Sequence, residues 1–169
     1  MKAASTTVVA LALPAAIFAA STASAQIPDA VAAPNEAVVA TIHAEGAQVY
    51  ECKAGSDGKP VWQFREPIAT LMIEGKTVGR HFVGPSWELA DGSTVTGKIT
   101  GHAAGATPKD IALLKIEAVS HRGSGQLAGV TTIQRLNTKG GALEGSCDSA
   151  GAFLIVPYSA DYRFLRKGS

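Results

Sequence analysis

Asp57-Gly58-Lys59-Pro60-Val61 returns twice in altered form, each time 17 residues later, as Glu74-Gly75-Lys76-Thr77-Val78 and Asp91-Gly92-Ser93-Thr94-Val95. An acidic residue followed by glycine favours a tight β-hairpin turn, because such turns need residues that tolerate positive φ. Two further breakers, Pro67 and Gly84-Pro85, lie between these three tips. The spacing therefore predicts a meander of short antiparallel strands.

The runs between the turns are rich in β-branched and aromatic residues, and several alternate with period two, as strands do. The segment 111–120 could instead begin a helix, but the alternation of Ile116, Ala118 and Ser120 with Glu117 and Val119 favours a strand. We expect an all-β fold, a single antiparallel β-sandwich or barrel of about 8–11 short strands with at most one short helix. The expected strands are 37–42, 48–52, 61–64, 69–73, 78–83, 87–89, 95–100, 112–119, 130–136, 153–156 and 162–165.

The first 25 residues have the pattern of a signal peptide. Lys2 is followed by an apolar run at 8–20, which is shorter than the ~20 residues of a membrane-spanning helix. Ala23-Ser24-Ala25 then gives the small-x-small cleavage pattern. We expect a signal peptide at 1–25, an extended arm at 26–36 and one β-domain at 37–169. The mature protein should have no membrane span and should be periplasmic or secreted.

Composition excludes two other classes of protein. A hydrophobic fraction of 46% is too high for an intrinsically disordered chain. The 15 basic and 14 acidic residues become 14 and 14 once Lys2 is removed with the leader. A neutral chain lacks the basic surface that nucleic acids require, so we expect no nucleic-acid partner.

Two cysteines occur, Cys52 and Cys147. Neither has the spacing of a redox or zinc motif. In an oxidising compartment the simplest expectation is that they form one disulfide, although two separate buried thiols would also fit.

Known catalytic and cofactor motifs are not found. Gly123-Ser124-Gly125-Gln126-Leu127-Ala128 matches the loose dinucleotide-binding pattern, but a poor helix follows it, so we interpret it as a glycine-rich hairpin loop. A metal site would have to be assembled across strands from His81, Glu88, Asp91 and His102, and structural histidines are the favoured interpretation. We therefore expect no cofactor and no metal.

The candidate site lies in the stretch His81-Phe82-Val83-Gly84-Pro85-Ser86-Trp87-Glu88. If Gly84-Pro85 is the centre of a hairpin turn, Phe82 lies opposite Trp87 and His81 lies opposite Glu88. One interpretation makes Phe82 and Trp87 core and His81 and Glu88 a solvated pair.

The other interpretation makes this hairpin a binding site. Trp87 would offer an apolar face, while His81 and Glu88 would form a polar pair. Arg135 on the strand 130–136 would be either a structural anchor or a further contact. The candidate ligand-binding residues are His81, Trp87, Glu88, Asp91 and Arg135.

Several blocks together resemble the family catalogued as domain of unknown function 3455. They are Gln48-Val49-Tyr50-Glu51-Cys52, the 81–88 stretch, Asp91-Gly92-Ser93, the segment 132–141 and Val156-Pro157-Tyr158-Ser159-Ala160-Asp161-Tyr162. The resemblance implies a secreted, β-rich domain and carries over no activity, substrate or catalytic residue. The family usually has Ile-Pro-Trp-Leu where this chain has Ile111-Ala112-Leu113-Leu114, and a proline where it has Ala142. If that tryptophan lines a pocket in the family, the pocket is altered here.

Three functions remain open. The leading hypothesis is a non-catalytic binding module for a small molecule, a glycan or an extracellular protein. The alternative is a hydrolase or lyase that uses His81 and Glu88 as acid and base groups. A further alternative is a periplasmic inhibitor of a lysozyme-like enzyme, suggested by the short Val-Tyr-x-Cys pattern at Val49–Cys52.

Overall fold

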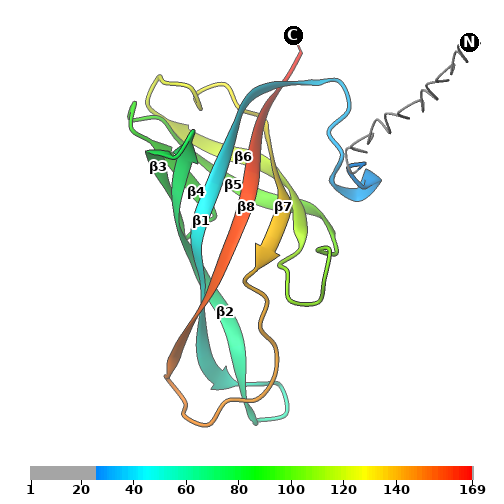
Figure 1. The fold of residues 1–169 in the computed structure, drawn as a ribbon, viewed down its shortest axis with the longest axis vertical. Helices are drawn as coiled ribbons and strands as arrows, with labels where there is room; N and C mark the ends of the chain where they lie inside the picture. Colours follow the sequence, from blue (N-terminus) through cyan, green and yellow to red (C-terminus); the bar gives the residue numbers. More distant parts are fainter. Residues whose placement is uncertain (1–25, 169) are drawn as a thin grey trace, which may run out of the picture.

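The computed structural model describes residues 26–168 and is a closed antiparallel barrel in which the strands follow one another in sequence order (Figure 1). This confirms the all-β prediction, and the barrel is the form that the meander takes. A short 3-10 helix, η1 (Asp29–Val31), precedes the sheet. The strands are β1 (Glu36–Ala54), β2 (Pro60–Ile73), β3 (Lys76–Phe82), β4 (Ser86–Leu89), β5 (Thr94–Ala103), β6 (Leu113–Arg122), β7 (Thr132–Gly140) and β8 (Phe153–Lys167).

The three repeated turn patterns lie where the spacing predicts them. They connect β1 to β2, β2 to β3 and β4 to β5. Gly58, Gly75 and Gly92 have φ values of 78°, 74° and 81°, in the region that glycine adopts without strain. The turn residues therefore determine the positions of these three hairpins.

Eight strands replace the eleven expected runs because three pairs of runs are continuous. β1, β2 and β8 each run through the gap between two expected runs, and the gap in β2 contains Pro67, which we had expected to be a breaker. Pro67 pairs with Gln48, and Pro157 pairs with Ala47, so both prolines lie within extended strands. Gly46 also lies within β1, where a Cβ would collide with the backbone oxygen of Ile68. That glycine permits close strand contact and does not form a turn.

Pairing of the first strand with the last closes the barrel. β1 and β8 pair antiparallel from Glu36 opposite Lys167 to Glu51 opposite Phe153. These long strands extend beyond the barrel wall together with β2, as the lower half of Figure 1 shows. The barrel consequently has one end that is prolonged by a twisted extension.

The core lies inside the barrel and is centred on aromatic side chains. Trp87, Tyr162 and Phe164 are fully buried, and the ring of Trp87 lies 5.3 Å from that of Tyr162 and 6.1 Å from that of Phe164. Ile42 and Leu71 extend the same cluster across β1 and β2. These inward residues fill one part of the interior.

The arm before β1 packs against the barrel. Val31 of η1 is fully buried, and its backbone oxygen accepts a hydrogen bond of 2.6 Å from the Gln134 side chain. Gln134 alternates with the inward residues Ile133 and Arg135, so η1, which packs mainly on β5 and β6, reaches the outer face of β7 at this point. Residues 1–25, where the signal peptide is expected, lie outside the described residues.

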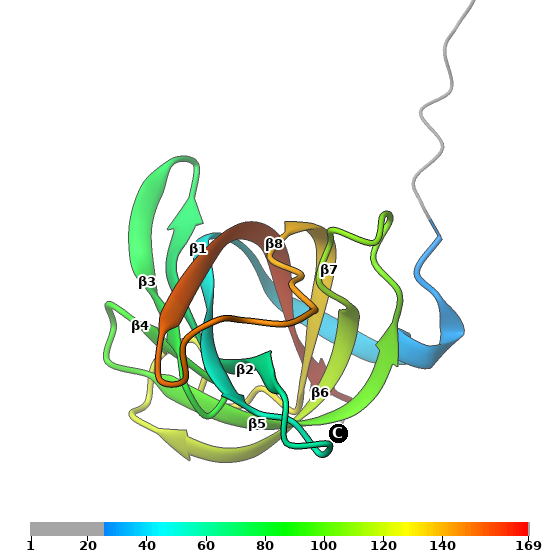
Figure 2. The same ribbon diagram turned by 90° about the horizontal axis from the view of Figure 1, so that it is seen from below.

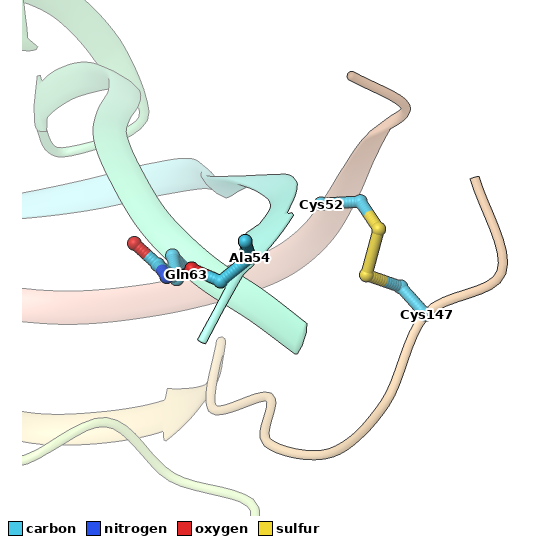
Figure 3. Close-up of a disulfide and its surroundings, with 4 residues drawn as sticks. All are labelled: Cys52, Ala54, Gln63 and Cys147. Carbon is cyan, nitrogen blue, oxygen red and sulfur yellow. Dashed lines mark hydrogen bonds between the residues drawn. A yellow bond between two sulfur atoms is a disulfide. The ribbon is translucent and has the colours of Figure 1, made fainter. Parts of the chain in front are cut away.

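A disulfide joins Cys52 to Cys147, as the sequence predicted, with the two Cα atoms 5.9 Å apart (Figure 3). Cys52 lies near the end of β1, and Cys147 lies in the connection between β7 and β8. We call residues 141–152 the covering segment, because this connection runs across the open end of the barrel (Figure 2). The disulfide fixes the covering segment to the extension of the barrel wall.

Within residues 26–168, no helix has the length and apolar character needed to cross a bilayer.

Candidate functional site

A cavity of about 600 Å³ lies inside the barrel beneath the covering segment. We call it the barrel cavity. Its deep wall consists of buried side chains, and its mouth is marked by lining residues that are exposed, such as Phe64, Val83 and Glu144. The volume is in the range that small organic ligands occupy. The buried lining residues are Gln48, Tyr50, Pro67, His81, Trp87, Ile111, Leu114, Ile116 and Tyr162.

The β3–β4 hairpin supplies His81 and Trp87, and here the predicted register is wrong by one residue. Phe82 pairs with Ser86, His81 with Trp87, and Arg80 with Glu88. The loop between the strands has three residues, 83–85, and its middle residue Gly84 has a φ of 137°. The turn is therefore centred on one residue instead of on the Gly84–Pro85 bond. Such a shift changes every cross-strand partner.

His81 stacks on Trp87 in this register. The two ring centres are 4.6 Å apart and nearly parallel, at 8°. His81 Nδ1 donates a hydrogen bond of 2.8 Å to the backbone oxygen of Ser86, because a carbonyl oxygen can only accept. This fixes the neutral tautomer and leaves Nε2 as an acceptor, for which no partner is found among the described residues. Burial lowers the pKa of His81 to about 4, so the ring is uncharged at neutral pH.

Two buried N–H groups on the cavity wall lack hydrogen-bond partners within the described part of the chain. They are Nε1 of Trp87, which is fully buried, and Nε2 of Gln48, a residue that is 3% exposed. Buried donors are nearly always paired with a protein group or with another molecule. Both residues line the barrel cavity, although the two nitrogens themselves have almost no accessible surface.

Arg135 enters the cavity from β7, where it lies directly opposite Tyr162 on β8 and Leu114 on β6. Its Nε donates a hydrogen bond of 3.0 Å to the backbone oxygen of Ala112. Burial raises the pKa values of Tyr50, Tyr158 and Tyr162 and lowers the pKa of His81. The positive charge of Arg135 acts on the same four side chains and lowers the pKa of each. The guanidinium therefore lies among the polar groups of the cavity.

Glu88 and Asp91 lie away from the cavity. Glu88 shares its face with Arg80, and its carboxylate lies 3.0 Å from Arg80 and 3.7 Å from Arg122 on the barrel exterior. The expected pairing of His81 with Glu88 is therefore wrong, since the two side chains occupy opposite faces of the sheet. Of the five candidate residues, the structure brings together His81, Trp87 and Arg135.

Asp91 has a structural position in the turn between β4 and β5. Its carboxylate accepts hydrogen bonds from the hydroxyl and backbone N–H of Ser93 and from the backbone N–H of Gln126. The Ser93 hydroxyl and these N–H groups hold the pKa of Asp91 below its usual value. The glycine-rich stretch 123–128 is thus a loop between β6 and β7 that Asp91 fastens to the neighbouring turn. No group of three or more His, Cys, Asp or Glu side chains suited to a metal ion occurs within residues 26–168.

A family model for a protein of unknown function, DUF3455, matches residues 32–166. The chain belongs to the DUF3455 family. The match runs from just before β1 to the last residues of β8 and so covers nearly the whole barrel. Neither the search of curated proteins nor the search of solved structures found a match.

Two alanines from the segments that the family resemblance singled out lie at the cavity. Ala112 and Ala142 line it, whereas Leu113, where the resemblance leads us to expect a tryptophan, does not. The expectation that the pocket is altered at the tryptophan position therefore does not apply to this cavity.

Sequence reasoning missed several cavity residues of this DUF3455 chain. Tyr162 alternates along β8 with less buried residues, so period two contained a signal there, whereas residues 47–50 of β1 are all buried and burial alone does not mark Gln48 and Tyr50. The hydroxyl of Tyr50 donates a hydrogen bond of 2.7 Å to the backbone oxygen of Gly141 in the covering segment. Closure of the sheet into a barrel decides which face of each strand is inward, and the sequence alone does not show it.

Proposed function

We propose that this chain is a non-catalytic binding protein that holds one small organic molecule in the barrel cavity and acts in the periplasm or outside the cell. The observation that carries the proposal is the cavity of about 600 Å³, with an apolar wall and a few polar groups at defined positions. Ligand sites have this character, and closed eight-stranded barrels are wide enough to hold one small ligand.

A binding role fits the chemistry of the cavity better than an acid–base reaction does. His81 is buried, stacked and committed through Nδ1 to a backbone oxygen, and its low pKa keeps it neutral. Glu88, the intended partner, lies on the opposite face. The alternative of a hydrolase or lyase built on His81 and Glu88 has therefore lost its geometric basis.

The disulfide supports the proposed location. Structural disulfides persist in oxidising compartments and are rare in the cytosol. The signal-peptide pattern that ends at Ala25 agrees with export. N-terminal sequencing of the protein recovered from periplasm or medium should begin at Gln26, and recovery only from the cytoplasm with Met1 intact would exclude this location.

Binding can be tested with N-phenyl-1-naphthylamine, a neutral apolar dye that becomes fluorescent in dry surroundings. The parent should enhance the dye's fluorescence saturably. Ala112→Trp should abolish the enhancement by filling the cavity, and Ala142→Trp serves the same purpose from the covering segment. Val119→Trp is the matched control, because Val119 is 57% exposed and does not line the cavity.

A cooperative thermal unfolding transition in each variant should demonstrate that the barrel still folds. Two outcomes would overturn the proposal. One is the absence of saturable binding to the parent, and the other is equal binding to the parent and to both folded blocking variants.

A further inference from the structure

Arg135, like Arg163 and Arg166, has no carboxylate partner in the described chain, and of these three it is the one that lines the barrel cavity. Arg80 and Arg122 lie beside Glu88, and Arg65 lies beside Glu51 and Glu66. Arg135 is part-buried and forms no salt bridge within residues 26–168; its Nε donates a hydrogen bond to the backbone oxygen of Ala112, and its side chain also interacts with the hydroxyl of Tyr162. A cation withdrawn from water among tyrosines and apolar side chains is unfavourable unless an anion joins it.

The two carboxylates of the cavity do not serve as that anion. Asp110 already accepts hydrogen bonds from the backbone N–H of Gly140 and from the backbone N–H and hydroxyl of Thr107. Glu144 lies in the covering segment with its side chain exposed at the mouth. The place beside the guanidinium is therefore available to a molecule that enters the cavity.

Apart from Arg135, the wall of the cavity is mostly apolar, and two of its polar nitrogens are fully enclosed. Trp87 Nε1 and Gln48 Nε2 are buried donors without partners in the described residues. Leu114, Ile116 and the stacked His81–Trp87 pair give the rest of the wall its apolar character. The cavity thus combines one positive charge with a large apolar surface.

We propose that the molecule bound in the barrel cavity is an amphipathic organic acid whose carboxylate pairs with Arg135 and whose apolar body packs against Trp87 and Ile116. This inference rests on the proposed function and adds the chemical class of the ligand. The planar fork of a guanidinium matches a carboxylate and can donate two parallel hydrogen bonds to it. A single arginine balances a single negative charge, so a monoanion fits better than a phosphate dianion.

The test is displacement of N-phenyl-1-naphthylamine by matched pairs that differ only in charge. One pair is 2-naphthylacetic acid and 2-naphthylacetamide, and the other is dodecanoic acid and dodecanamide. At pH 7 the acid of at least one pair should displace the dye with an affinity about ten- to hundredfold higher than its amide, the range expected for hydrogen bonds to a charged group. 2-Naphthyl phosphate is included to detect a preference for a dianion.

Arg135→Gln should remove the preference. It should lower the binding affinity of the acid while leaving the affinity of the amide within about threefold of its parental value. Arg135→Lys keeps the charge without the planar fork and should retain part of the preference. Arg80→Gln is the matched control, since it removes an equal charge from the barrel exterior beside Glu88. It should leave the acid-to-amide ratio unchanged.

The outcomes separate the two proposals. If the dye binds in the cavity but each amide displaces it as well as its acid, the carboxylate inference is wrong and the binding function stands. The same holds if neither pair displaces the dye, if the phosphate binds more tightly than both acids, or if folded Arg135→Gln keeps the parental ratio. If the dye itself does not bind in the cavity, the proposed function fails first.

Discussion

The stability of this protein should depend on pH through His81, a buried ring that is neutral in the folded barrel. Burial lowers its pKa from 6.5 to about 4, and unfolding restores the ordinary value. Between these two values the unfolded chain binds more protons than the folded chain does. Linkage then requires the free energy of unfolding to fall as the pH falls through this interval.

The magnitude follows from the two pKa values. At pH 7 both states are mostly neutral at His81, and the effect is small. At pH 5 the unfolded ring is almost fully protonated while the folded ring is about nine-tenths neutral, which lowers the free energy of unfolding by about 2 kcal/mol. Below pH 4 the loss reaches its limit of about 3 kcal/mol.

Urea unfolding at pH 7 and pH 5, followed by tryptophan fluorescence with the disulfide intact, measures this loss. His81→Gln should be less stable than the parent at pH 7 but should lose about 2 kcal/mol less between the two pH values. His102→Gln, which alters an exposed histidine, should keep the parental difference. Equal losses in the parent and in His81→Gln would show that the ring is not a buried neutral group.

Three further predictions concern stability. Replacing both Cys52 and Cys147 with alanine should lower the free energy of unfolding by about 4–5 kcal/mol, since the disulfide spans 95 residues, and thiol titration of the unreduced, unfolded parent should find no free thiol. Trp87→Ala should cost about 3–5 kcal/mol by urea titration and should also weaken dye binding, because the side chain is both core and cavity wall; an unchanged midpoint would contradict this. Asp91→Ala should leave the sheet intact but speed amide hydrogen exchange at Gln126 and Ser93, because their backbone N–H groups donate hydrogen bonds to the Asp91 carboxylate. Unchanged exchange at these two positions would mean that the carboxylate does not hold the loop.

The turns were the part of the fold that local sequence could predict. A tight turn depends on a few adjacent residues, so the acid-glycine tips identified three hairpins. Strand breaks were harder, because Gly46, Pro67 and Pro157 have turn-forming character locally but lie in extended strands. At Gly46 the deciding factor was the approach of a neighbouring strand, which no local pattern records.

The candidate site was predictable in its residue types and less so in its partners. His81 and Trp87 were predicted as candidate ligand-binding residues, and both line the cavity. Their mutual contact depended on whether the turn is centred on a bond or on a residue, and the wrong choice exchanged Trp87 for Glu88 as the partner of His81. Arg135 could be placed on a strand, but its lack of a carboxylate partner depends on the packing of distant elements.

Closure of the barrel by β1 and β8 has a consequence for synthesis. The chain emerges from the ribosome with β1 first, but the strand that covers one edge of β1 is the last to appear. Until residues 153–167 are available, that edge presents unpaired backbone groups, and exposed edges of this kind promote association with other chains. A polypeptide truncated before Phe153 should therefore accumulate as an aggregating intermediate, however well its earlier hairpins form.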